Sequence, residues 1–251
     1  MIPKRYYLKT IKVLSIGNSF SQDAQRYLYG IARADGIEIK AVNLYIGGCS
    51  LSKHCRNILS EDDVYSFEIN GICNTGIKVS MKEALLSDDW DYITIQQQSL
   101  ESCDYDTFTP YLEILNEYVR RHCPKAKILL LKTWGYKNGS EKLEKAGYSS
   151  NREMFEDIEK AYAKAKERIS AKRIIPLGNA VAMAAEMGAE NIYRDEFHMS
   201  MGFGRYLLGL VFYGSLVGRP VDINPFCDFD KDISDEDVAL AKKIATEVLK
   251  K

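Results

Sequence analysis

Residues 11–21 read IKVLSIGNSFS, a pattern that predicts a strand, a tight turn and the start of a helix. Residues 13–16 form a short, mostly apolar run after charged residues, which is typical of a strand buried on both faces. Gly17 ends the run, and the polar residues after it offer turn and N-cap chemistry before a helical pattern at residues 22–34. This stretch therefore predicts the first unit of an α/β fold.

Ser19 lies at the predicted start of that helix, beside backbone N–H groups that have no partner within the helix. The position suits a serine nucleophile, because its own N–H group could bind the oxyanion formed when its hydroxyl attacks a carbonyl. The stretch is equally consistent with a structural role in which Ser19 or Ser21 caps the helix. By itself the motif does not decide between the two.

The composition predicts one α/β domain over residues 1–251, with 46% hydrophobic residues and a formal net charge of −1. The 34 Lys and Arg residues are dispersed among 35 Asp and Glu residues, which argues against a nucleic-acid partner. No run approaches the roughly 20 apolar residues of a membrane helix, so no membrane partner is expected. The N-terminal MIPKRYYLKT lacks an apolar signal core, which favours a cytoplasmic location, although a leader already removed would leave no trace.

The cysteines predict reduced thiols, because they are scattered and contain no CxxC pair. Cys49, His54 and Cys55 are close in sequence, but they provide only part of a structural zinc site, which needs four ligands. Neither a metal nor an organic cofactor is predicted. The six cysteines are Cys49, Cys55, Cys73, Cys103, Cys123 and Cys227.

Further strand patterns alternate with helical patterns along the chain. Strands are expected at residues 37–45, 92–95, 128–131 and 173–177, and helices at residues 51–59, 80–86, 108–122, 151–170, 180–187 and 202–216. Residues 63–79 interrupt the alternation and contain an Asn-Gly turn, so a small inserted hairpin or irregular excursion is expected there. The alternation predicts a three-layer α/β/α sandwich around a five-stranded parallel sheet of flavodoxin-like type.

Candidate functional residues follow the predicted strands, at the edge where open α/β sheets bind ligands. Gly48 follows the second strand and could present backbone N–H groups, although a plain turn is the simpler explanation of it alone. Gln96 and Gln97 end the third strand, where buried amides need hydrogen bonds, either to a ligand or to the loop backbone. Trp134 follows the fourth strand and is expected either in a pocket wall or packed on the core.

Asp195 and His198 lie in a loop before the apolar helix predicted at residues 202–216. A carboxylate three residues before a histidine can orient the imidazole and fix the tautomer that a general base needs. A helix-capping role for Asp195, with His198 incidental, is the simpler explanation of these two residues alone. Together with Ser19, however, they lie on one predicted rim in the chain order Ser, Asp, His.

This set of motifs resembles the SGNH (GDSL-type) hydrolase superfamily. GNSFS at residues 17–21 is similar to the first block, with Asn18 replacing the usual acid. Gly48 is similar to the second block's glycine, and DEFH at residues 195–198 matches the DxxH block. The third block's GxND is absent, and QQQS occupies its strand end. The resemblance therefore points to a divergent branch with GNSF, QQ and DxxH blocks, in which Gln96 or Gln97 could replace the usual asparagine donor.

The resemblance implies hydrolysis of an acyl ester through a covalent serine intermediate. Ser19 would attack, His198 would take its proton, and Asp195 would hold the ring.

The oxyanion would be bound by N–H groups of Ser19 and Gly48 and by one glutamine amide. Strand alternation lets only one glutamine face the pocket, and we favour Gln97 over Gln96. Asn18 and Trp134 are expected near the substrate.

By analogy, the expected substrate is an O-acetylated carbohydrate or another small-molecule ester. The alternatives are a lipase or thioesterase with the same triad, and a catalytically silent domain that binds a glycan or another partner. The sequence does not determine the oligomeric state.

Overall fold

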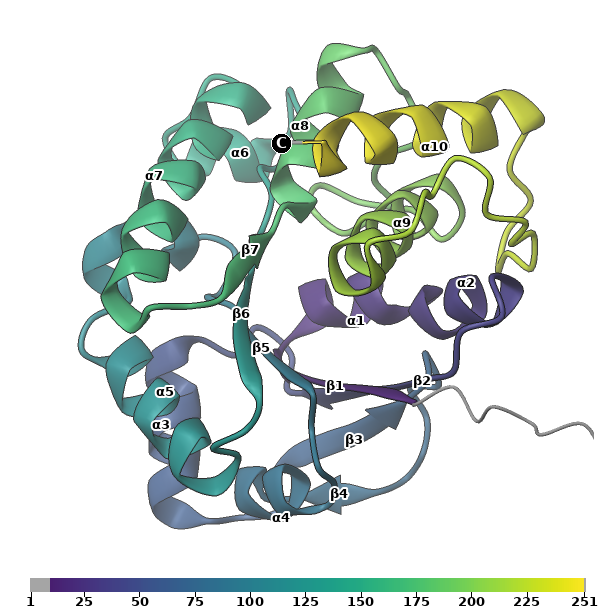
Figure 1. Ribbon diagram of the computed structural model, residues 1–251. Coiled ribbons are helices and arrows are strands. Elements are labelled where there is room, and N and C mark those ends of the chain that lie inside the picture. The colour runs from purple at the N-terminus through teal and green to yellow at the C-terminus, as the bar shows by residue number, and fades with distance from the viewer. Residues whose placement is uncertain (1–9, 251) are drawn as a thin grey trace, which may run out of the picture.

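A sheet of seven strands in the order β4-β3-β2-β1-β5-β6-β7 organises the chain, with β1 at its centre (Figure 1). The computed structural model describes residues 10–250, so both ends of the predicted 1–251 domain lie outside the described residues. The strands are β1 (Ile11–Gly17), β2 (Ile39–Tyr45), β3 (Tyr65–Ile69), β4 (Lys78–Val79), β5 (Tyr92–Ile95), β6 (Lys127–Leu131) and β7 (Arg173–Ile175).

The predicted five-stranded parallel sheet is confirmed by the pairing of β2, β1, β5, β6 and β7, all of which run parallel. The segment at residues 63–79 forms the expected hairpin. It supplies β3 and β4, which extend the sheet by two antiparallel strands instead of forming a separate excursion. Backbone and side-chain hydrogen bonds between Asn70 and Ala41 fasten the turn of this hairpin to β2.

Helices cover both faces of the sheet, which confirms the three-layer sandwich (Figure 1). One face carries α1 (Ser19–Gln25), α2 (Leu28–Ala34) and α9 (Phe203–Val217), with α8 (Leu177–Glu186) and α10 (Asp235–Leu249) packed beside α9. The other face carries α3 (Leu51–Ser60), α4 (Met81–Leu86), α5 (Tyr111–His122) and α7 (Asn151–Ile169). Short elements lie in the loops: η1 (Glu101–Cys103), η2 (Tyr105–Thr107) and α6 (Glu141–Lys145).

The helix predicted at residues 22–34 is two helices, α1 and α2, and α1 begins earlier, at Ser19. Neither Ser19 nor Ser21 is the N-cap. Asn18 caps α1 through its side-chain oxygen, which accepts the Phe20 N–H group at 3.0 Å. Helices α6 and α10 were not predicted. Helix α6 has only five residues, whereas α10 buries Ala241, Ile244, Ala245 and Val248 at helical spacing, a signal that sequence reasoning missed.

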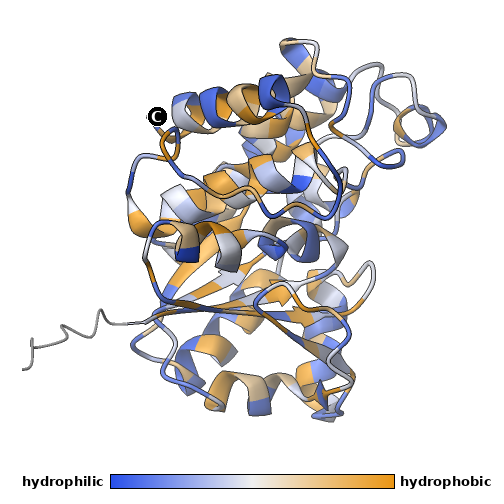
Figure 2. Cartoon of the chain, turned by 90° about the vertical axis from the view of Figure 1, so that its right-hand side faces the viewer, coloured by the Kyte–Doolittle hydropathy of each residue, from blue (hydrophilic) through white to orange (hydrophobic). Residues whose placement is uncertain are grey.

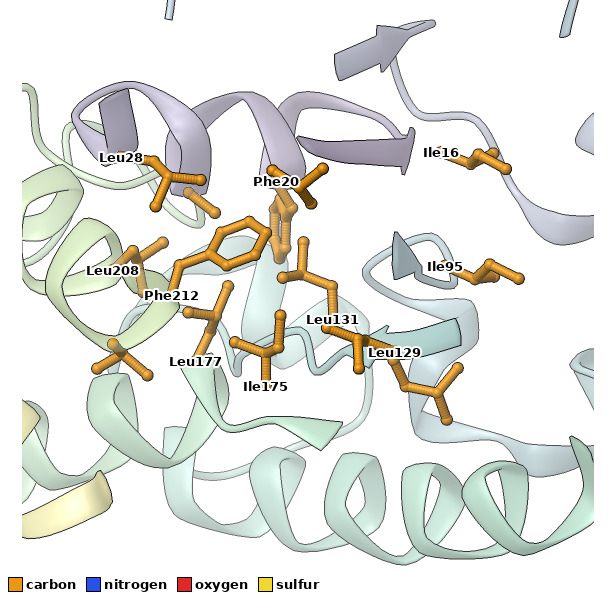
Figure 3. Packing of buried hydrophobic residues seen from close by; sticks show 14 of the residues in the cluster. Ile16, Phe20, Leu28, Ile95, Leu129, Leu131, Ile175, Leu177, Leu208 and Phe212 are labelled. Atoms are coloured by element: carbon orange, nitrogen blue, oxygen red, sulfur yellow. The ribbon is translucent and has the colours of Figure 1, made fainter. Parts of the chain in front are cut away.

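Buried hydrophobic residues form a core cluster between the layers. The strands of the sheet are largely coloured as hydrophobic in Figure 2. Val13, Leu14 and Ile16 of β1 are fully buried, as expected for a strand covered on both faces. Phe20, in the first turn of α1, points into the same core as Leu131 and Phe212 (Figure 3). The first turn of α1 is therefore anchored by packing as well as by its cap.

The order of the parallel strands places a switch point between β1 and β5. After β1 the chain enters α1 on one face, and after β5 it continues to α5 on the other. A crevice forms at such a point, outside the carboxyl ends of the strands.

Among residues 10–250, no helix has the length and apolar character needed to cross a bilayer. The six cysteines lie in the described part of the chain and are free thiols.

We predict that alanine at Gly71 costs more stability than alanine at Gly76, although both glycines have positive φ. At Gly71 a Cβ atom would overlap the carbonyl oxygen of Arg26, whereas at Gly76 it would meet open space. Gly76→Ala should lower the free energy of unfolding by about 1–2 kcal/mol from backbone strain alone. Gly71→Ala should lower it by at least about 1 kcal/mol more, because steric overlap is added. Urea unfolding of both variants measures the difference, and equal losses would contradict close packing of the hairpin against α1.

Candidate active site

Ser19, His198 and Asp195 form one hydrogen-bonded chain at the rim of the sheet. His198 Nε2 lies 2.9 Å from Ser19 Oγ, and His198 Nδ1 lies 2.7 Å from Asp195 Oδ2. With the proton on Nδ1 and Nδ1–H donating to the carboxylate, Nε2 has a free electron pair with which to accept the serine proton. The fold thus brings together the three residues that sequence reasoning selected as a triad.

Asp195 closes the loop around His198 and does not cap the following helix. Its Oδ1 accepts the N–H groups of Phe197 at 2.9 Å and His198 at 2.7 Å. Partial burial raises the pKa of the Asp195 carboxyl, but bonds from the backbone N–H groups of His198 and Phe197 and from the His198 ring outweigh it. The resulting pKa lies below its ordinary value. The carboxylate is therefore ionised at neutral pH and available to hold the imidazole ring.

Asn18 links the turn before Ser19 to two neighbouring strand ends. Its Nδ2 donates to the Cys49 carbonyl at 3.0 Å, and its Oδ1 accepts both Phe20 N and Gln96 Nε2. The side chain is 2% exposed, so each of these bonds is shielded from water. Asn18 therefore fixes the turn that presents Ser19.

A pocket of about 300 Å³ adjoins the triad. Asn18 contributes to its wall, as predicted, and Gly48 faces it from the loop after β2. No hydrogen-bond partner is found among the described residues for the backbone N–H groups of Ser19 and Gly48. The lining residues are Asn18, Ser19, Phe20, Tyr45, Gly47, Gly48, Gln98, Ser99, Lys142, Phe197 and His198.

Trp134 is not among the residues that line this pocket, contrary to its expected place near the substrate. It is fully buried, stacks on Phe20 with ring centroids 3.9 Å apart, and donates its indole N–H to the Phe197 carbonyl at 2.8 Å. The predicted alternative, packing on the core, is the observed one. Trp134 supports the site from behind, because both of its contacts are with residues of the pocket wall.

The side chain of Gln97, the favoured oxyanion donor, forms hydrogen bonds with other parts of the protein. Its Oε1 accepts the N–H groups of Leu51 and Gln98, both at 2.9 Å. Its Nε2 donates to the Thr107 carbonyl at 3.0 Å and to the Thr107 hydroxyl at 3.2 Å. The amide is fully buried and fastens three segments, so it has no donor for an oxyanion, and the prediction for Gln97 is wrong.

Gln96 faces the other side of the strand but is also not among the pocket-lining residues, because its Nε2 donates to Asn18 Oδ1 at 2.8 Å. The glutamine that lines the pocket is the third one, Gln98. Its Oε1 accepts two loop N–H groups, and its Nε2 lies 3.3 Å from Ser99 Oγ. The signal in the sequence was the end of the strand pattern at residue 95, which leaves the last amide of the triplet furthest toward the rim.

The sequence also matches a known protein family. The sequence model of a family described as a domain of unknown function, DUF4886, matches residues 12–248. The chain belongs to the DUF4886 family. A DUF4886 family protein from Bacteroides uniformis ATCC 8492 has a crystal structure similar to this chain, with 31% sequence identity and a TM-score of 0.86. The match covers 95% of this chain and 94% of that protein.

More distant structures share the fold of this DUF4886 chain. A candidate SGNH hydrolase from Slackia heliotrinireducens is 22% identical with a TM-score of 0.59, over 83% of this chain and 100% of that one. A candidate GDSL-like lipase from Parabacteroides merdae ATCC 43184 is 15% identical with a TM-score of 0.55, over 83% and 95%. The SGNH-like fold is thereby confirmed. No curated protein matches the chain.

Asp23 is a residue of the site that sequence reasoning missed. It lies in α1, on the same helix as Ser19, and is fully buried. Its carboxylate accepts Arg194 Nη1 at 2.8 and 2.9 Å, Arg205 Nε at 2.8 Å and the Met199 backbone N–H at 3.0 Å. Arg194 and Met199 immediately flank the loop that carries His198, so Asp23 holds both ends of that loop to the helix that begins at Ser19.

One signal for this contact was present in the sequence. Arg205 is the only charged residue of α9, a described helix that is otherwise apolar or small and nearly all buried. A buried arginine needs an acidic partner, so its presence indicated a carboxylate within the core. Which carboxylate it meets depends on the packing of α9 against α1.

We expect Asp23→Asn to lower the free energy of unfolding by about 3–5 kcal/mol, because it leaves two guanidinium groups near a neutral amide in a buried position. Glu141→Gln is the matched control. Glu141 pairs with Lys145 on the surface, with side chains 73% and 71% exposed, and should change stability by less than about 0.5 kcal/mol. Chemical unfolding of the two variants measures both values. Similar small losses would show that Asp23 does not hold the loop.

Proposed function

We propose that this DUF4886 chain is a serine ester hydrolase that cleaves short acyl esters, with O-acetyl groups on carbohydrates as the best candidates. The observation that carries the proposal is the continuous chain of hydrogen bonds from Asp195 through His198 to Ser19. Its position at the carboxyl ends of the strands, beside a pocket, supports the same conclusion.

In the first half of the reaction, Ser19 Oγ attacks the ester carbonyl carbon while His198 Nε2 takes the hydroxyl proton. Asp195 stabilises the imidazolium that forms, through its bond to Nδ1. The imidazolium then gives its proton to the leaving alkoxide, and an acyl-serine is left. Water repeats the sequence with His198 as base, which releases the acid and restores Ser19.

The developing oxyanion requires donors aimed at the carbonyl oxygen. The backbone N–H groups of Ser19 and Gly48 are two candidates, since neither has a partner among the described residues. Gly48 has a φ of +59°, and a Cβ there would meet nothing within 4 Å, so the loop is open on that side. The amide Nε2 of Gln98 is the candidate third donor, in place of Gln96 and Gln97.

A small acyl group fits the site better than a long chain. The pocket has a volume of about 300 Å³, at the lower end of ligand pockets, and much of its wall is polar. A lipase or long-chain thioesterase needs an extended apolar channel for the acyl chain. These features favour acetyl or similarly short acyl groups.

We predict that purified protein hydrolyses 4-nitrophenyl acetate and that kcat/KM falls by at least about 10-fold on the octanoate ester. Ser19→Ala and His198→Ala should each lower kcat by about 10⁴-fold or more, because the triad acts as a unit. A fluorophosphonate probe should add its mass to the wild-type protein and not to Ser19→Ala. Preference for octanoate would favour the lipase alternative, and neither turnover nor labelling would favour the silent binding domain.

A second prediction distinguishes the role of Gln98 in the pocket from the structural role of Gln97. Gln98→Ala should lower kcat by about 10²-fold with little change in KM, as expected for an oxyanion donor. Gln97→Ala should act mainly on stability and lower the free energy of unfolding by about 2–4 kcal/mol, because buried loop N–H groups lose their acceptor. Ester kinetics and thermal unfolding of both variants give the comparison. Wild-type turnover by Gln98→Ala would contradict a role for Gln98 as oxyanion donor, and only the backbone N–H groups of Ser19 and Gly48 would then remain as candidates.

A further inference from the structure

Lys142 brings a cation to the wall of the catalytic pocket. It belongs to α6, the short helix in the loop after β6, and lines the pocket together with Phe197 and His198. Its Nζ lies 3.8 Å from the centroid of the Phe197 ring, and the ring centroids of Phe197 and His198 are 4.0 Å apart. The ammonium group is thus one aromatic ring away from the catalytic base.

The position of α6 is fixed by the loop that carries the triad. The backbone N–H of Lys142 donates to Glu196 Oε1 at 3.0 Å, and Lys137 N donates to the Glu196 carbonyl at 2.8 Å. Leu143, the next residue, is 1% exposed and anchors the helix in the core. Lys142 is therefore held near His198 by bonds to a residue between Asp195 and His198.

The neighbouring Glu196 carboxylate binds the backbone of Lys142 and not its ammonium group. In the described part of the chain no Asp or Glu oxygen forms an ion pair with its Nζ, whereas Lys145 on the same helix pairs with Glu141 at 2.5 Å. None of the pocket-lining residues is an aspartate or glutamate. An anion that enters this pocket therefore meets a half-buried ammonium group without an ion-pair partner in the described part of the chain. The two acids of the neighbouring loop do not line the pocket: Asp195 is bonded to the His198 ring, and Glu196 accepts the backbone N–H of Lys142.

The reaction geometry indicates which part of the substrate the ammonium group meets. In the proposed mechanism His198 must deliver a proton to the leaving oxygen, so the alcohol portion has to lie on the His198 side of Ser19. Lys142 stands over Phe197 on that side, whereas Gly48 and Gln98 are the candidate oxyanion donors around the acyl carbonyl. A charged group on the alcohol portion is the one within reach of Lys142.

We propose that the ester this site cleaves is an ester of an acidic alcohol, such as an O-acetylated sugar acid, whose carboxylate pairs with Lys142. This inference rests on the proposed ester hydrolysis and narrows its substrate class. A charge-assisted bond of this kind is expected to favour the acidic ester by about 10-fold in kcat/KM.

The test compares two substrates that differ only in the carboxylate: O-acetylated methyl glucuronide and O-acetylated methyl glucoside, with release of acetate as the readout. The wild-type protein should prefer the glucuronide by about 10-fold, and the preference should shrink as salt is raised. Lys142→Met keeps an unbranched stem over Phe197 but removes the charge, and should reduce the ratio of the two kcat/KM values to near one. Lys142→Arg should retain the preference.

Lys145→Met is the matched control, because it removes a neighbouring lysine from the same helix at a position 71% exposed. It should leave the ratio of the two substrates at the wild-type value. An acyl-side control compares 4-nitrophenyl hemisuccinate with 4-nitrophenyl butyrate. A Lys142-dependent preference confined to the hemisuccinate would overturn the placement of the anion on the alcohol portion.

The outcomes separate this inference from the function on which it rests. If wild type cleaves both sugar esters through Ser19 at equal rates, and Lys142→Met does not change the ratio, the acidic-substrate inference is wrong and the esterase proposal stands. If no ester is cleaved and the fluorophosphonate probe does not label Ser19, both proposals fail.

Discussion

The geometry of the candidate site depends on the ion pairs and hydrogen bond that the buried carboxylate of Asp23 accepts. Ser19 and His198 come from segments 179 residues apart, and no short connection keeps their side chains in register. Asp23 lies on the serine's helix and binds the residues on both sides of the histidine's loop. A fully buried charge is costly unless it is paired, and here two arginines and one backbone N–H group satisfy it. Separating these charges would be costly, and their pairing therefore keeps Ser19 and His198 close together.

The polar side chains at the rim of the sheet fall into two groups. Some bind only other protein groups, and others line the pocket of the candidate site. Asn18 holds the turn before Ser19, Gln96 holds Asn18, and Gln97 fastens the loop after β2 to the loop after β5. These amides are buried, and the NH2 group of each donates to an acceptor within the protein. Side chains used in this way give rigidity to the serine turn. The groups available to a substrate are those nearer solvent, at Gln98 and along the backbone at Gly48.

Aromatic packing completes the support of the triad from the core side. Phe20, next to Ser19, stacks on Trp134, which in turn donates to the carbonyl of Phe197, next to His198. The rings of Phe20 and His198 also meet edge to face, with centroids 6.2 Å apart. The serine and the histidine are thus each adjacent in sequence to a phenylalanine in contact with one tryptophan. The fully buried indole thus links the two sides by one stacking contact and one hydrogen bond to a backbone carbonyl.

The sequence by itself determined the features that depend on local pattern. The apolar run of β1, the alternation of strands and helices, and the polar residues at strand ends predicted the parallel sheet, its layers and the residues Ser19, Asp195 and His198. Tertiary structure alone decided which amide of the glutamine triplet faces the pocket, where Trp134 lies, and that residues 63–79 extend the sheet. It also decided the partners of Asp23, which come from distant segments of the chain. The physical reason is that sequence periodicity records only which face of an element is buried. The direction of a side chain at a strand end, and the partner of a buried charge, are set by the elements that pack around them.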